Sequence, residues 1–204
     1  MNAATERVLI VGAAGAIECA LDIPSVPSVG LAVLAHPHPL FGGTLDNKVV
    51  QTLARAFVQL GFTVVRPNFR GVGASAGVHD EGVGEALDLQ QVAEHFRALH
   101  PGRLLLAGFS FGGAVASKAA PKLHGLERLV LIAPATRFGL EAVSADTLVI
   151  HGEQDDVVPL AAVMDWARPQ ALPIIVVPAG GHFFHGQLPL LKALVLRNFG
   201  ISDA

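Results

Sequence analysis

The chain has 204 residues, of which 51% are hydrophobic and only 15% are charged, and its formal net charge is −3. These values argue against a disordered chain and fit one well-buried domain over residues 1–204. The lack of a basic excess argues against nucleic acid or an anionic membrane as partner, and no apolar run reaches the ~20 residues of a transmembrane helix.

The hydrophobic pattern predicts alternating strands and helices. In chain order, we expect strands over 7–11, 16–23 and 29–35, a helix over 47–60, a strand over 62–65 and a helix over 84–100. There follow a strand over 103–109, a helix over 112–120, strands over 129–133 and 148–151, a helix over 160–167, a strand over 174–177 and a helix over 187–199. Asp46 is the expected N-cap of the 47–60 helix and Gly61 its C′ residue. The alternation from residue 29 onward predicts an α/β fold with a mostly parallel sheet covered by helices on both faces.

The segment LLLAGFSFGG, residues 104–113, combines a buried strand pattern with a serine between two glycines. A G-x-S-x-G sequence between a strand and a helix predicts a tight turn that lifts the Ser110 hydroxyl out of the sheet. The hydroxyl then lies beside a helix N-terminus, where backbone N–H groups and the helix dipole stabilise developing negative charge. Taken alone, Ser110 could equally be an ordinary turn serine.

A serine hydroxyl becomes a good nucleophile only when a base takes its proton and an acceptor orients that base. Two carboxylates, Asp155 and Asp156, follow the strand 148–151, and His182 lies in a glycine-rich loop after the strand 174–177. Ligands and catalytic groups of open α/β sheets gather at the carboxyl ends of the strands, where these residues are expected. Each has an ordinary alternative, as a solvated loop acid or a loop histidine. Their agreement in order and position with Ser110 favours a catalytic interpretation.

Four segments give the chain a resemblance to a known family. HGEQDDVVP resembles the acid segment of α/β-hydrolases, and GGHFF resembles their histidine segment. PNFRGVGASAG is similar to a loop of the same family, with Asn68 where the family often has Asp. HPHPLFGGTLDNK resembles the oxyanion loop of a lidless bacterial subgroup akin to dienelactone-hydrolase-like proteins. The resemblance covers residues 36–184.

This resemblance implies the α/β-hydrolase fold, with the acid on Asp155 and not on Asp156, and the base on His182 and not on His185. Only about fourteen residues separate the strands 129–133 and 148–151, where members of the family normally insert a lid, so we expect no large lid domain. Dienelactone hydrolases use a cysteine nucleophile, whereas this chain has a serine there, so their substrate class is not implied.

An oxyanion hole needs two N–H donors, and the first should be the N–H of Phe111, directly after the nucleophile. The second should come from the loop 36–41, whose two prolines lack an N–H, which leaves His38, Leu40 and Phe41. We favour Leu40, because the pair of glycines just beyond it lets the loop turn tightly over the site.

Other polar residues have more ordinary interpretations. His36 and His38 are separated by a stiff proline and have no acidic or histidine cluster near them, so we expect no metal and no cofactor. We expect Arg70 to fix its loop through a salt bridge or a backbone bond and not to anchor substrate. An apolar acyl pocket is expected from some of the phenylalanines Phe41, Phe109, Phe111, Phe183 and Phe184.

The sequence therefore predicts a cytoplasmic serine hydrolase that cleaves an ester or thioester of a small acyl substrate through an acyl-enzyme on Ser110. A noncatalytic binding protein of the same fold is the alternative, and an intact Ser-Asp-His set argues against it. A nucleotide-binding oxidoreductase is suggested by Gly12 and Gly15 in VLIVGAAGAIECAL, but the alternating pattern that follows fits a strand better than the helix such a loop must open.

Overall fold

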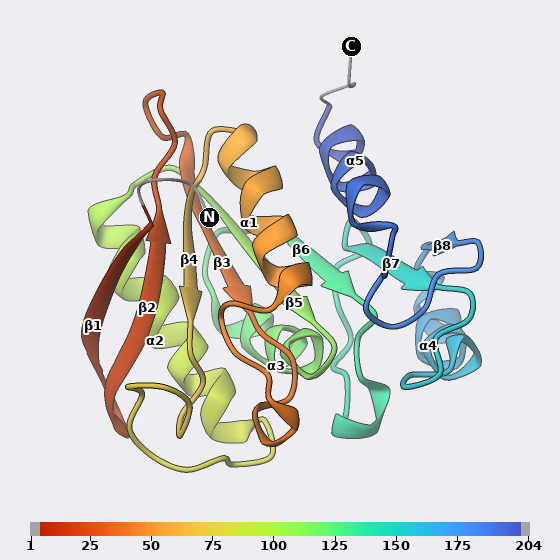
Figure 1. Cartoon of the computed structure of the whole chain (residues 1–204), viewed down its shortest axis with the longest axis horizontal. Coiled ribbons are helices and arrows are strands. Elements are labelled where there is room, and N and C mark those ends of the chain that lie inside the picture. Colours follow the sequence, from red (N-terminus) through yellow and green to blue (C-terminus); the bar gives the residue numbers. More distant parts are fainter. Residues whose placement is uncertain (1–4, 201–204) are drawn as a thin grey trace.

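The computed structural model describes residues 5–200 and contains one eight-stranded sheet in the order β1-β2-β4-β3-β5-β6-β7-β8 (Figure 1). The strands are β1 (Glu6–Gly12), β2 (Gly15–Asp22), β3 (Gly30–Ala35), β4 (Thr63–Pro67), β5 (Arg103–Phe109), β6 (Leu126–Ile132), β7 (Leu148–Gly152) and β8 (Ile174–Val177). Strand β2 pairs antiparallel with β1 and β4, and all other pairs are parallel. The carboxyl ends of the parallel strands therefore meet at one edge, which confirms the predicted α/β class.

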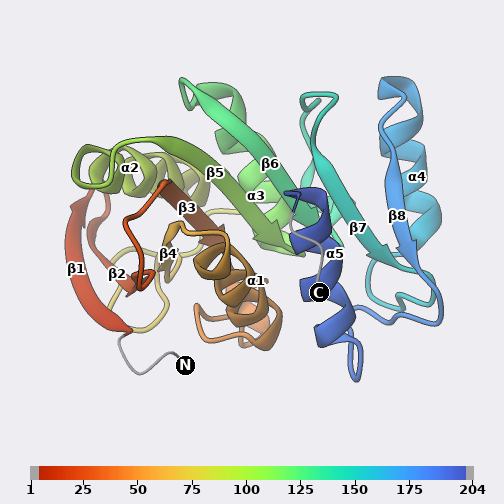
Figure 2. The ribbon, with the colours of Figure 1, turned by 90° about the horizontal axis from the view of Figure 1, so that it is seen from above.

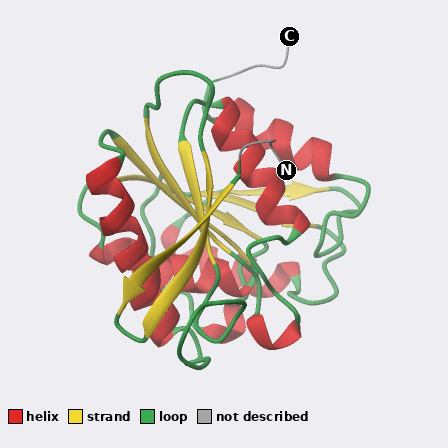
Figure 3. Ribbon diagram, turned by 60° about the vertical axis from the view of Figure 1, so that its left-hand side comes forward, coloured by secondary structure: helices red, strands yellow, loops and turns green. Residues whose placement is uncertain are grey.

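Helices cover both faces of the twisted sheet (Figures 2 and 3). They are α1 (Lys48–Gln59), α2 (Val83–Leu99), α3 (Phe111–Ala119), α4 (Leu160–Ala167) and α5 (Leu188–Asn198). Helices α1 and α5 pack on one face, and α2, α3 and α4 pack on the other. Strand β3 is buried along its whole length, because Leu31 and Val33 enter one core while Ala32 and Leu34 enter the opposite one. A continuous apolar run is what a strand covered on both faces requires.

Two sequence expectations are corrected at element ends. The N-cap of α1 is Asn47 and not Asp46: the Asn47 side chain accepts the N–H groups of the first turn, whereas the Asp46 carboxylate binds Arg7 Nη2 at 2.6 Å. Strand β6 begins three residues earlier than expected, because its polar start is paired with β5 through Glu127, whose Oε2 accepts from Arg103 Nε at 2.8 Å.

The turn between β1 and β2 and the segment between β6 and β7 test the expectations about a dinucleotide site and a lid domain. Gly12 and Gly15 pair with each other at the tip of the β1–β2 hairpin, so this segment is not the strand-to-helix loop of a dinucleotide site. Between β6 and β7 the chain forms only a short 3-10 helix, η3 (Thr136–Phe138), and no lid domain is present within residues 5–200. None of the helices in that range has the length and apolar character that a bilayer crossing requires.

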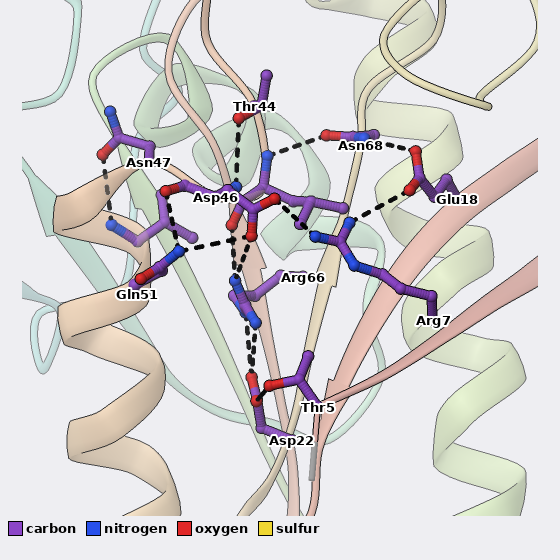
Figure 4. A network of polar contacts seen from close by, with 12 residues as sticks. Thr5, Arg7, Glu18, Asp22, Thr44, Asp46, Asn47, Gln51, Arg66 and Asn68 are labelled. Carbon is purple, nitrogen blue, oxygen red and sulfur yellow. Dashed lines mark hydrogen bonds and ion pairs between the residues drawn. The ribbon is translucent and has the colours of Figure 1, made fainter. Parts of the chain in front are cut away.

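A polar network anchors the loop that joins β3 to α1 (Figure 4). The guanidinium of Arg66, only 2% exposed, lies 3.0 Å from Asp22 Oδ2 and donates to the carbonyl of Leu45 at 2.8 Å. The Leu45 N–H donates to Asn68 Oδ1 at 2.9 Å, and Asn68 Nδ2 donates to Glu18 Oε2 at 2.8 Å. Both backbone polar groups of Leu45 are thus held by side chains at the end of β4.

His36, at the start of the same loop, connects it to the segment that follows β4. Its imidazole is completely buried, with Nε2 accepting from the Phe69 N–H at 2.9 Å and Nδ1 lying 2.6 Å from the Pro37 carbonyl. One nitrogen must accept and the other donate, so the ring is neutral. Burial lowers the pKa of His36 to about 4.

Replacing Arg66 with Met should lower the free energy of unfolding by about 3–5 kcal/mol, because it leaves the Asp22 carboxylate buried without its cation. Urea unfolding at neutral pH measures the change. The matched control is Arg168→Met, which removes an exposed ion pair with Asp165 and should cost no more than about 1 kcal/mol. Equal losses in the two variants would contradict the anchoring role of Arg66.

His36 should make the fold sensitive to mild acid. The pKa of His36 in the folded state lies below the unfolded value of about 6.5. Its contribution to the free energy of unfolding is therefore fully present above that pH and is lost as the pH falls toward 4. The loss between pH 7 and pH 5 should be about 2 kcal/mol. Urea unfolding at both pH values should show a shallower decline for His36→Asn, whereas the exposed control His124→Gln should keep the wild-type decline. A His36→Asn variant that declines like the wild type would refute this.

Candidate active site

Ser110 occupies a strained turn between β5 and α3, with φ 56° and ψ −118°. The turn is possible because both flanking residues are glycines, whose missing side chains let the backbone come very close to other backbone atoms of the chain. A Cβ atom on Gly112 would lie 2.4 Å from the Ala35 carbonyl oxygen, and one on Gly108 would lie 2.1 Å from the Gly112 carbonyl oxygen. Neither position admits a side chain, which is the physical reason for the G-x-S-x-G pattern.

Backbone hydrogen bonds on both sides hold the strained serine in place. The Ser110 N–H donates to the Ile132 carbonyl at 2.9 Å, at the end of β6. Its carbonyl accepts from Gly113 in α3 at 2.9 Å and from Ala135 at 3.0 Å. An unfavourable φ persists where the surroundings over-determine it, as they do here.

The structure brings Ser110, Asp155 and His182 into one hydrogen-bonded chain. His182 Nε2 lies 2.9 Å from Ser110 Oγ, and His182 Nδ1 lies 2.7 Å from Asp155 Oδ2. All three residues are buried, whereas the neighbouring alternatives Asp156 and His185 are exposed and take no part in this chain. The arrangement requires a proton on Nδ1 facing the carboxylate, which leaves Nε2 to accept the serine proton.

The Asp155 carboxylate is held in its charged form. Burial raises its pKa, but the hydrogen bond with His182 and the N–H of Val158 outweigh burial and hold the pKa below its usual range. Asp155 Oδ1 accepts from the N–H groups of Val157 at 2.9 Å and Val158 at 2.7 Å. One carboxylate oxygen is therefore used by the loop, and the other faces the imidazole.

His151 is a site residue to which the sequence analysis assigned no role. It is the last residue but one of β7 and is fully buried, and its Nε2 lies 2.9 Å from the Val158 carbonyl and 3.5 Å from Asp155 Oδ2. Burial lowers the pKa of His151, so its ring is neutral and contacts the loop that carries Asp155. The available signal was a polar side chain at the end of an otherwise apolar strand.

The N–H groups near the serine distinguish the candidate oxyanion donors. Phe111 is the first residue of α3, where an N–H has no partner within the helix. In the loop after β3, the Leu40 N–H donates to His38 Nδ1 at 3.2 Å and the Phe41 N–H donates to the His38 carbonyl. The structure thus argues against Leu40, whose N–H is already engaged. Among the three loop candidates, only the His38 N–H has no hydrogen-bond partner within the described part of the chain.

A cavity of about 350 Å³ opens directly over the serine. Its lining is mostly apolar and consists of Pro37, His38, Phe41, Gly43, Asn47, Ser110, Arg137, Val157, His182 and Phe183. Of the five phenylalanines from which some were expected to form the pocket, Phe41 and Phe183 line the cavity, and the other three are completely buried in the core. A second hollow of about 380 Å³, around Glu127 and Arg128 at the start of β6, contains none of the three hydrogen-bonded residues.

Arg70 lies outside this cavity and fixes its own loop, as expected. Its Nε and Nη2 donate to the two carboxylate oxygens of Asp88, at 2.8 and 2.9 Å. Within residues 5–200, no three His, Cys, Asp or Glu side chains are grouped in a way that could hold a metal ion.

Comparison with known proteins gives consistent similarities. Residues 42–143, half of the chain, match the family described as serine aminopeptidase, S33. A serine hydrolase without a lid from Xanthomonas campestris is 40% identical, with a TM-score of 0.88 over 97% of this chain and 94% of that chain. An α/β serine hydrolase homologue from Coxiella burnetii is 38% identical, with a TM-score of 0.88 over 96% of this chain and 97% of that one.

A curated protein from Rickettsia prowazekii, described as uncharacterized, is 36% identical over 125 residues, which are 60% of this chain. The match spans about half, 52%, of the length of that relative. Together with the sheet order and the serine turn, the similarities show that the chain belongs to the α/β-hydrolase superfamily, in the hydrolase family described as serine aminopeptidase, S33.

Proposed function

We propose that this chain is a serine hydrolase that cleaves carboxylic esters or thioesters through an acyl-enzyme on Ser110. The observation that carries the proposal is the hydrogen-bonded chain from Ser110 Oγ through His182 to Asp155, with separations of 2.9 and 2.7 Å, at the base of an apolar cavity.

In the proposed reaction, Ser110 Oγ attacks the carbonyl carbon of the substrate while its proton passes to His182 Nε2. The Asp155 carboxylate stabilises the imidazolium that forms. We assign the oxyanion to the N–H groups of Phe111 and His38, the second in place of Leu40. Collapse of the tetrahedral intermediate releases an alcohol or thiol, which takes the proton from His182. Water then attacks the acyl carbon with His182 as its base. The bond between that carbon and Ser110 Oγ breaks, the acid leaves, and Oγ takes the proton back from His182.

The cavity favours an ester or thioester over the peptide substrate that the family description suggests. An aminopeptidase must hold the ammonium group of its substrate, which calls for a carboxylate near the nucleophile. The cavity lining has no Asp or Glu, and the fixed charge that it does have is the cation of Arg137. An ammonium group would therefore meet repulsion at this site.

The nucleophile can be tested by covalent labelling. A fluorophosphonate probe should label the wild-type protein at neutral pH and should not label Ser110→Ala, because no other serine within residues 5–200 is hydrogen-bonded to the His182 base. Turnover of a p-nitrophenyl ester should fall in that variant by roughly 10⁴-fold or more. The exposed control Ser25→Ala should keep both labelling and turnover. A wild-type protein that stays unlabelled and inactive would overturn the proposal.

The identity of the acid can be tested by comparing two neighbouring amides. Asp155→Asn should lower kcat by roughly 10⁴-fold, because it removes the acceptor that fixes the imidazole tautomer. Asp156→Asn removes an exposed carboxylate and should change kcat by less than about threefold. Steady-state kinetics on one activated ester measure both, and comparable losses would move the orienting role away from Asp155.

A further inference from the structure

We propose that Arg137 forms an anion subsite in the cavity over Ser110, and that the acyl substrate carries a carboxylate near its scissile bond. This inference rests on the proposed ester or thioester hydrolysis. It adds a charge requirement to that reaction.

Arg137 is an exposed residue of the short helix η3, which begins shortly after the end of β6, and it lines the same cavity as Ser110 and His182. Its guanidinium carbon lies 4.8 Å from the ring centre of Phe138 and 5.9 Å from that of Phe41. Aromatic faces attract a guanidinium and restrict its orientation, so less freedom is lost when it binds an anion.

The guanidinium of Arg137 has no hydrogen bond or ion pair within the part of the chain that the structure describes. Among the described arginines it shares this property only with Arg197, on the last turn of α5. Five others bind a carboxylate of the protein: Arg7, Arg66, Arg70, Arg103 and Arg168. Arg137 therefore offers unused donors, and it offers them inside the candidate active site.

No acidic side chain of the cavity lining competes for Arg137. Two glutamates lie near His38. Glu85 is completely buried, accepts from the N–H of Gly82 and lies 2.8 Å from His79 Nδ1, and Glu81 Oε1 lies 3.5 Å from His79 Nε2. Burial lowers the pKa of His38, and the charges of His79 and Arg137 lower it further, so the His38 ring is neutral near pH 7. The cavity thus combines an apolar wall with one fixed positive charge.

A planar guanidinium fork matches the two oxygens of a carboxylate, which makes a carboxylate-bearing ester the best fit. Two matched pairs of substrates locate that group. The acyl pair is the p-nitrophenyl monoester of glutarate against p-nitrophenyl pentanoate. The leaving-group pair is 4-acetoxybenzoate against its methyl ester. For each pair, the ratio of kcat/KM for the charged ester to that for the neutral ester is measured at low ionic strength.

Arg137→Gln should lower this ratio by about tenfold or more for at least one pair, relative to the wild type. Arg137→Lys keeps the positive charge but lacks the planar guanidinium, so its ratio should lie between those of the wild type and Arg137→Gln. The control Arg197→Gln changes the net charge equally but lies outside the cavity, and should leave both ratios unchanged. Ratios within twofold of the wild type for both pairs in Arg137→Gln would overturn the anion subsite, even if neutral esters are cleaved.

A second measurement separates this inference from the proposed reaction. In a Ser110→Ala background, monomethyl glutarate should bind at least tenfold more weakly after Arg137→Gln, as measured by calorimetry, while dimethyl glutarate should show no such change. If the wild type cleaves none of the four esters, the proposed reaction fails and this binding comparison alone decides the subsite. Equal affinities of Ser110→Ala and of Ser110→Ala/Arg137→Gln for monomethyl glutarate would refute it.

Discussion

The close contact of the Ser110 turn with the ends of β3 and β6 is the constraint on which the site depends. Gly112 packs so tightly against the Ala35 carbonyl that no side chain fits between them, and the Ile132 carbonyl fixes the Ser110 N–H from the other side. Three adjacent parallel strands therefore define the position of one hydroxyl. Helix α3 begins at the next residue, so the proposed nucleophile and the first proposed oxyanion donor, the Phe111 N–H, are neighbours along the backbone.

Three of the four buried carboxylates in residues 5–200 have partners of two kinds. Asp22 and Asp88 are bound by guanidinium groups and hold loops, whereas Asp155 meets an imidazole that has a second nitrogen available for Ser110. An arginine cannot give up its proton, so an Asp–Arg pair is a structural fastening. An Asp–His pair can pass a proton on, and this difference separates Asp155 from Asp22 and Asp88.

The sheet, the serine turn and the order of acid and base could be predicted from the sequence, because each depends on short-range pattern and on the rule that strand ends gather at one edge. Details set by distant residues could not. Asp46 and Asn47 are both good capping residues, and the choice between them depends on Arg7, which reaches Asp46 from β1. The Leu40 N–H is occupied because the His38 side chain bends back onto its own loop, a rotamer that no spacing reveals.

Asn68 stands at a position where α/β-hydrolases often have Asp, and its contacts show why an amide is needed in this chain. Its oxygen accepts from the Leu45 N–H and its nitrogen donates to the Glu18 carboxylate. An aspartate here would set two negative charges face to face, with no proton to share at neutral pH. Positions 18 and 68 are therefore expected to vary together among relatives, an acid at one being accompanied by a donor at the other.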